Sequence, residues 1–185
     1  MKKTLVIVAH PNMHRSRINQ RWIDRLAQEP DRYTVHDLYK AYPDSVIDVE
    51  REQKLVQEHD TIIFQFPMFW FSSPPLLNQW QDEVLTYNWA YGSSGNALVG
   101  KKFSVAVAAG IWEEDYSQEG RYTYTIEEVL RPFEMTVKYC KANYYPYYAL
   151  FGTETKSDTR KELSESEIQA SVDNYIAHLE KIAAL

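Results

Sequence analysis

The sequence predicts an α/β protein with a parallel sheet at its centre and helices on both of its faces. Short apolar runs alternate along the chain with segments in which apolar residues recur at helical spacing. Uninterrupted apolar runs are typical of strands that are buried on both faces, and the alternation with helices favours right-handed crossovers. The expected strands are 4–9, 33–38, 61–66, 103–109 and 144–150.

The segments between these strands carry helix-start signals. Side chains that can cap a helix precede the apolar faces of most of them, and two prolines open another. Pro132 lies within a further helical pattern and is expected to kink it. The signals are Ser16, Asp48, Pro74–Pro75, Thr125 and a capping box of Ser164 with Glu167.

Length and composition indicate one globular domain over residues 1–185. Hydrophobic residues make up 44% and charged residues 25%, and no linker, repeat or low-complexity segment interrupts the chain. The net charge of -6 argues against nucleic-acid binding and against attraction to anionic membranes.

The single cysteine, Cys140, excludes an intramolecular disulfide and a multi-cysteine metal site, and an inert buried thiol is expected there. The apolar run near the start is too short for a signal peptide, and no segment has the length of a membrane helix. We therefore expect a soluble cytoplasmic protein.

In open parallel sheets, ligands bind beyond the carboxyl ends of the strands. This rule nominates loops 10–16, 67–74 and 110–122. The first loop lacks glycine but brings Ser16 and the following N–H groups to a helix N-terminus, which is an anion site. Arg15 and Arg17 could add positive charge, although ordinary capping by Ser16 with solvated arginines accounts for the pattern equally well.

The second loop places large apolar side chains directly after a strand, over 67–71. They could form a lid over the core, or a wall for a planar ring whose edge bonds to backbone N–H groups. The third loop begins with the small residues of 108–110, which would let a ligand approach the backbone closely.

These motifs together resemble the NAD(P)H:quinone oxidoreductase family. They are His10, Ser16-Arg17-Ile18-Asn19, the segment FPMFWFSSPPLLNQWQDEVL, NWAYG and a strand ending in AAG. The likeness runs from about Lys2 to Phe151. It is closest to the small bacterial branch that includes glutathione-regulated potassium-efflux ancillary proteins and general stress oxidoreductases.

The resemblance implies a flavodoxin-like fold with strand order 2-1-3-4-5, bound FMN or FAD, a homodimer, and two-electron reduction of quinones by NAD(P)H. By matching position, the phosphate would be held by His10, Ser16, Arg17, Ile18 and Asn19. The isoalloxazine would be lined by Pro67, Met68, Phe69, Trp70 and Phe71. Its pyrimidine side would be bonded by Ala108, Ala109, Gly110 and Ile111.

This chain departs from the family at two places. The fourth-strand loop usually reads Thr-Thr-Gly-Gly, and here two hydroxyl donors are lost and Ile111 replaces a glycine. A tyrosine and a histidine often flank the flavin; Tyr116 matches the first, but Tyr122 stands at the second. Both are catalytic candidates, although a phenol with a pKa near 10 is a poorer proton shuttle than imidazole.

The expected mechanism is ping-pong, with nicotinamide and acceptor stacking on the flavin in turn. One alternative is a regulatory flavoprotein docked on a potassium-efflux antiporter. Another is a one-electron carrier, which the aromatic loops 88–100 and 110–125 disfavour because they suggest a pocket for a second substrate. No metal site is expected from the acidic residues 113–115, and the histidines other than His10 are expected to be exposed or structural.

Overall fold

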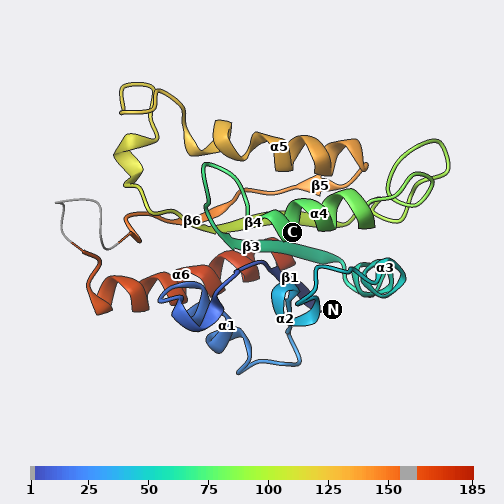
Figure 1. Ribbon diagram of the computed structural model, residues 1–185, viewed down its shortest axis with the longest axis horizontal. Helices are drawn as coiled ribbons and strands as arrows, with labels where there is room; N and C mark the ends of the chain where they lie inside the picture. The colour runs from blue at the N-terminus through green and yellow to red at the C-terminus, as the bar shows by residue number, and fades with distance from the viewer. Residues whose placement is uncertain (1–2, 155–161) are drawn as a thin grey trace.

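A computed structural model describes residues 3–154 and 162–185. Its parallel sheet has the order β2-β1-β3-β4-β5, with β6 also pairing with β4, which confirms the order expected from the resemblance. The strands are β1 (Thr4–Val8), β2 (Tyr33–Asp37), β3 (Thr61–Pro67), β4 (Lys102–Ala108), β5 (Asn143–Tyr144) and β6 (Tyr148–Leu150). The flavodoxin-like arrangement follows from β1 and β3 lying side by side at the centre (Figure 1).

The strand predicted at 144–150 is interrupted in the structure. Two short strands, β5 and β6, each pair in parallel with β4, so the sheet has six strands where the sequence indicated five. Pro146 lies in the gap, and it has no N–H to donate to a ladder. Its carbonyl accepts a hydrogen bond from the Ser104 hydroxyl at 2.6 Å, which holds the interruption against β4.

Helices connect the strands as predicted, with one further short helix at 38–41 that was not predicted. They are α1 (Asn19–Leu26), α2 (Leu38–Ala41), α3 (Val49–Gln57), α4 (Pro75–Val84), α5 (Ile126–Tyr139) and α6 (Glu165–Ala184), with short 3-10 turns η1 (Met13–Arg15) and η2 (Glu113–Asp115). The side chains of Asp48, Thr125 and Ser164 accept the capping bonds expected of them. The α5 helix continues through Pro132 without ending there.

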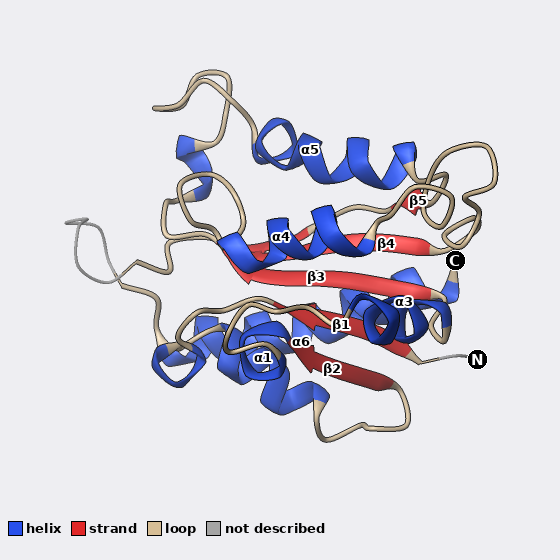
Figure 2. Cartoon of the chain, turned by 45° about the vertical axis from the view of Figure 1, so that its right-hand side comes forward, coloured by secondary structure: helices blue, strands red, loops and turns tan. Residues whose placement is uncertain are grey.

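Two hydrophobic clusters cover the faces of the sheet. On one face, Trp22 of α1 packs against Tyr175 of α6, and both rings are fully buried. On the other face, α2 to α5 enclose a second cluster that includes Trp80 and Phe133. The α1–α6 layer and the α4–α5 layer lie on opposite sides of the sheet (Figures 1 and 2).

The second cluster contains a buried carboxylate. Glu52 of α3 is fully buried and accepts hydrogen bonds from Tyr42 Oη at 2.5 Å and Trp80 Nε1 at 2.7 Å, with His36 Nε2 at 2.8 Å. Burial raises the pKa of this carboxyl, but the hydrogen bond and charge of His36, then Tyr42 and Trp80, outweigh it and leave the pKa below its usual value. Trp80 thus has a structural partner, and His36 is structural as expected.

Cys140 is buried at the end of α5, and burial raises the pKa of its thiol, as an inert cysteine requires. Within residues 3–154 and 162–185, no helix is both long and apolar enough to cross a membrane. The same residues contain no group of His, Cys, Asp and Glu side chains that could hold a metal ion.

Candidate functional site

Loops after β1, β3 and β4 meet at the carboxyl edge of the sheet and enclose two adjoining cavities. The larger has a volume of about 800 Å³ and the smaller about 210 Å³, and Pro67, Ala108 and Thr153 line both. The smaller is also lined by His10, Arg15, Ser16, Arg17, Ile18 and Asn19. The larger is also lined by Met68, Phe69, Trp70, Phe71, Gly110, Ile111, Tyr116, Tyr122 and Glu154.

The smaller cavity is rich in hydrogen-bond donors. Ser16 Oγ accepts from the Asn19 N–H at 3.0 Å, so the capping bond predicted for Ser16 is present although α1 begins only at Asn19. The hydroxyl proton of Ser16 remains able to donate. The N–H groups of Arg17 and Ile18 have no acceptor among the described residues, so they can bond an anion.

His10 adds a directed donor to this cavity. Its Nδ1 accepts from the Asn12 N–H at 3.1 Å, so the neutral ring carries its proton on Nε2. Partial burial lowers the pKa of His10, against smaller opposing effects from Asp37 and the backbone. Arg17 is partly engaged with Glu165, at 3.4 Å, so its charge is shared between the cavity rim and α6.

The larger cavity has an aromatic wall built on a tight turn. Phe69 and Ser72 exchange two backbone hydrogen bonds of 2.8 and 2.9 Å around Trp70 and Phe71, which have φ values of 50° and 60°. Two successive left-handed residues are the conformation of a type I′ turn, which costs bulky side chains steric strain.

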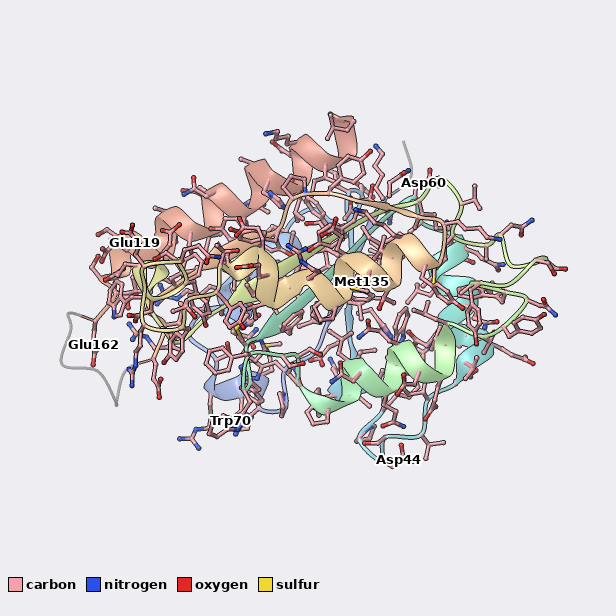
Figure 3. All side chains as sticks on the ribbon, turned by 90° about the horizontal axis from the view of Figure 1, so that it is seen from above. Asp44, Asp60, Trp70, Glu119, Met135 and Glu162 are labelled. Atoms are coloured by element: carbon pink, nitrogen blue, oxygen red, sulfur yellow. The ribbon has the colours of Figure 1, made fainter. Side chains whose placement is uncertain are left out.

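The turn exposes its aromatic side chains instead of burying them. Trp70 is 95% exposed and projects at the edge of the molecule (Figure 3), and Phe69 and Phe71 are about 42% and 41% exposed. A lid over the core is therefore the wrong interpretation of this loop. The N–H groups of Met68 and Phe69 are taken by backbone carbonyls, which leaves those of Trp70 and Phe71 for a ligand.

Tyr116 and Tyr122 also line the larger cavity, with ring centroids 6.1 Å apart. Phe71 contacts both rings, at 6.5 and 5.1 Å. The Tyr116 hydroxyl donates to Met68 Sδ at 3.4 Å, and sulfur is a weak acceptor that a better one can replace. Burial, then the neighbouring Tyr122, raises the pKa of Tyr116 to about 12, so its hydroxyl stays protonated and able to donate.

The loop after β4 forms another wall of the larger cavity, and the residues predicted there line it, except for Ala109. Ala108, Gly110 and Ile111 line the larger cavity, and the N–H groups of Gly110 and Ile111 have no backbone acceptor among the described residues. Ala109, which we expected to bond the cofactor, is fully buried and donates its N–H to Leu150 O at 2.8 Å. Pairing with β6 therefore turns Ala109 away from the site.

Sequence reasoning missed two residues of the site, Thr153 and Glu154. They follow β6 and return across the mouth of both cavities, where Glu154 lies against Gly110. A Cβ on Gly110 would come within 3.1 Å of the Glu154 Cβ, so the glycine permits this close approach. The resemblance ended near Phe151 and gave no signal for them.

The loop at 88–100 does not belong to this site. It lies at the other end of the sheet from the loop at 110–122 (Figure 1, right and left). Tyr91 of this loop instead lines a groove between α4 and α5 that continues to Phe71. Within the single chain, only the loop at 110–122 therefore shapes the larger cavity, and the loop at 88–100 does not support a second-substrate pocket there.

A sequence model of the family described as a flavodoxin-like fold matches residues 2–176. The chain belongs to this family. An uncharacterized NAD(P)H oxidoreductase of Bacillus subtilis, YrkL, is 46% identical over 177 residues, covering 96% of this chain and 97% of the relative. The potassium-efflux ancillary protein KefG of Serratia proteamaculans is 44% identical, covering 75% of each chain.

Solved structures agree over nearly the whole chain. General stress protein 14 of Treponema denticola, in complex with FMN, has a TM-score of 0.89 and 46% identity, covering 97% of this chain and 99% of its own. An NADPH-quinone reductase from P. pentosaceus has a TM-score of 0.82 and 31% identity, covering 94% and 95%.

Proposed function

We propose that this protein is an FMN-dependent NAD(P)H oxidoreductase that reduces quinones or similar acceptors in two-electron, ping-pong steps. The observation that supports this most is the division of the site into a small cavity of donors and a larger aromatic one that share a wall. A flavin mononucleotide has the same division, with an anionic phosphate at one end and a flat ring at the other.

The residues present fit this cofactor. Ser16, His10 Nε2 and the free N–H groups of Arg17 and Ile18 supply donors to a phosphate. The N–H groups of Gly110 and Ile111 stand where they can bond the ring's pyrimidine side. A volume of about 210 Å³ suits one phosphate better than the adenosine diphosphate part of FAD, which favours FMN.

Bound flavin would supply the hydride chemistry, taking a hydride from NAD(P)H and passing it to the acceptor. The protein's own contribution is orientation and charge stabilisation. The aromatic wall at 69–71 supplies apolar surface against which a flat ring can lie, and it leaves the cavity open for that ring to enter. Tyr116, which keeps its proton, can donate to negative charge that develops on a ring in the cavity.

We also propose a homodimer. A groove between α4 and α5 is lined by residues that include Phe71, Tyr91 and Tyr139. Exposed apolar side chains lie beside it, such as that of Met135, which is 64% exposed. Met135 lies on the outward side of α5 (Figure 3). Phe71 lines both this groove and the larger cavity, so a two-fold interface here would complete the rim of the site.

A second candidate function is that of an ancillary flavoprotein of a potassium-efflux antiporter, which the KefG relative supports. Either function places the protein in the cytoplasm, where its nicotinamide substrate is found and a free buried thiol such as Cys140 persists. Co-purification with an antiporter, and a change in potassium efflux on deleting the gene, would favour the ancillary role.

The deciding experiment is the visible spectrum of the purified protein, with mass identification of whatever is released on denaturation. We expect bound FMN, bleaching by NADH or NADPH without oxygen, and recovery of the spectrum when a quinone is added. Protein that takes up no flavin at micromolar concentration contradicts the proposal. If NAD(P)H bleaches the flavin and no quinone restores the spectrum, the proposal of a flavin cofactor stands and the proposal of a quinone acceptor is overturned.

A further inference from the structure

A glutamine lies inside a strand whose first six residues are all buried. Gln65 of β3 is fully buried, between Phe64 and Phe66. A buried amide has two N–H donors and a carbonyl acceptor, and leaving them without partners costs stability. The residue therefore needs partners that the strand itself does not provide.

Its partners come from α1 and α6. Gln65 Nε2 donates to Asn19 O and to Asn19 Oδ1, both at 3.3 Å. Tyr175 Oη donates to Gln65 Oε1 at 3.0 Å. Asn19 is 1% exposed and Tyr175 fully buried, so the chain Tyr175–Gln65–Asn19 crosses the interior and ends at the smaller cavity, which Asn19 lines.

The order of donors and acceptors in this chain allows one arrangement. The Asn19 carbonyl can only accept, so Gln65 must turn Nε2 toward α1 and Oε1 toward Tyr175. The Asn19 side chain must then present Oδ1 to Nε2. Burial raises the pKa of Tyr175 far above its ordinary value, so its hydroxyl remains a donor.

This arrangement also fixes the direction of Nδ2, the nitrogen of the Asn19 side-chain amide. With Oδ1 held by Gln65, Nδ2 is directed away from β3, and it has no acceptor among the described residues. We propose that Gln65 and Tyr175 are positioning residues, which fix the Asn19 amide so that its Nδ2 donates to a phosphate monoester in the smaller cavity. This inference rests on the proposed function.

Neither positioning residue touches that cavity, whose lining includes Asn19 but not Gln65 or Tyr175. An amide that is free to rotate presents an oxygen to the anion part of the time, and this oxygen repels it. The hydrogen-bonded chain Tyr175–Gln65–Asn19, called the relay below, removes that unfavourable orientation before the ligand arrives. This is preorganisation of a charge-assisted hydrogen bond.

The test compares FMN with riboflavin, which has the same ring and no phosphate, in Gln65→Met and Tyr175→Phe. Dissociation constants are measured by flavin fluorescence on protein freed of cofactor. We expect Gln65→Met to raise the dissociation constant for FMN about tenfold and Tyr175→Phe to raise it about threefold. The affinity for riboflavin should be unchanged in both variants. In an Asn19→Ala background, Gln65→Met should leave the FMN-to-riboflavin ratio as it was.

The matched control is Tyr148→Phe. Tyr148 stacks on Tyr175 at 5.3 Å, and its hydroxyl donates to Ser171 O, so its removal disturbs the same layer without touching the relay. We expect this variant to keep the wild-type ratio. If Gln65→Met does not fold, Tyr175→Phe decides, because it removes one oxygen only.

Wild-type protein that binds FMN, with ratios unchanged in both relay variants, would overturn the inference and leave the proposed function intact. A parallel loss of FMN and riboflavin affinity would also overturn it, because it would show a structural role alone. Wild-type protein that binds neither flavin would overturn the proposed function and the inference together.

Discussion

The two cavities of the site are built in opposite ways. The smaller one is formed by backbone and polar groups, and its Asn19 is held from behind by the buried Gln65 and Tyr175. The larger one is formed by exposed aromatic side chains on a turn with two left-handed residues, Trp70 and Phe71. One is fixed from the interior, and the other faces solvent.

This difference separates two tasks of the site. Under the proposed function, donors fixed by the core set how tightly an anionic cofactor is held, because they need no rearrangement on binding. Side chains at the exposed wall can change without disturbing the core, so they can set which flat substrate enters. Substitutions at the two ends should therefore affect different measurements.

The largest effect is expected from Asn19→Asp. The carboxylate still accepts from Gln65 Nε2 but replaces the free Nδ2 donor with a second oxygen that faces the phosphate. We expect FMN affinity to fall roughly a hundredfold, because a donor becomes a repelling charge, with little change for riboflavin. Calorimetric titration of both flavins measures it, with Asn19→Ala as the intermediate control. Equal losses for both flavins would break the division of tasks.

Tyr122→His probes the exposed end. Tyr122 is half-buried against Phe71, at 5.1 Å, so imidazole can take its place at the cavity wall without opening the core. Reoxidation by a quinone needs protons as well as electrons, and imidazole titrates in the useful range. We expect quinone-dependent reoxidation to accelerate about tenfold, with bleaching by NAD(P)H unchanged, in stopped-flow traces.

The control for this variant is Tyr124→His, since Tyr124 is 61% exposed and lines neither cavity. A gain in Tyr124→His equal to that in Tyr122→His would remove Tyr122 from the catalytic candidates.

A smaller effect is expected from pH at the phosphate end. Burial lowers the pKa of His10 in the free protein, and a bound phosphate raises it, so flavin binding takes up a proton at His10. The affinity for FMN relative to riboflavin should therefore rise by a few-fold as the pH falls from about 7.5 to 6. Titrations of both flavins at the two pH values measure this ratio, and His10→Gln should remove most of its rise. A rise that persists in His10→Gln would show that another titrating group causes it.

The smallest effect concerns strain in the exposed turn. Trp70 has φ of 50° and is 95% exposed, so Trp70→Asn relieves a conformation that asparagine tolerates better while losing almost no packing. We expect the free energy of unfolding of the apo protein to rise by about 0.5–1 kcal/mol in urea titration. Tyr124→Asn, at an exposed residue without a left-handed φ, should give no gain.

The strands and the loops that form the cavities were predictable from the sequence because each signal is local, whereas the strand order came from the family resemblance. Apolar runs marked the strands, and the position of a loop after a strand placed residues such as Ser16 and Phe69 at one edge. Contacts between distant segments were not predictable in this way. The β6 pairing that turns Ala109 inward, and the return of Thr153 and Glu154 over the cavities, depend on where Pro146 interrupts a strand.

One distant contact did leave a signal. Gln65 is a polar residue inside the apolar run TIIFQF, and a buried polar side chain implies hydrogen-bond partners. The sequence could have shown that partners exist, but not that they are Asn19 and Tyr175, the second of which lies 110 residues further along.

Trp80 lies within the segment FPMFWFSSPPLLNQWQDEVL that carries part of the resemblance, yet its indole N–H is bonded to the buried carboxylate of Glu52. The segment therefore serves two unrelated purposes. Its residues 69–71 form the wall of the proposed ligand cavity, and Trp80 donates a hydrogen bond to the buried Glu52 carboxylate. A paralogue that had lost its cofactor would still need the second. For that reason, a match to the Trp80 end of this segment identifies ancestry, while chemistry must be judged from the turn at 69–71 and the residues around Asn19.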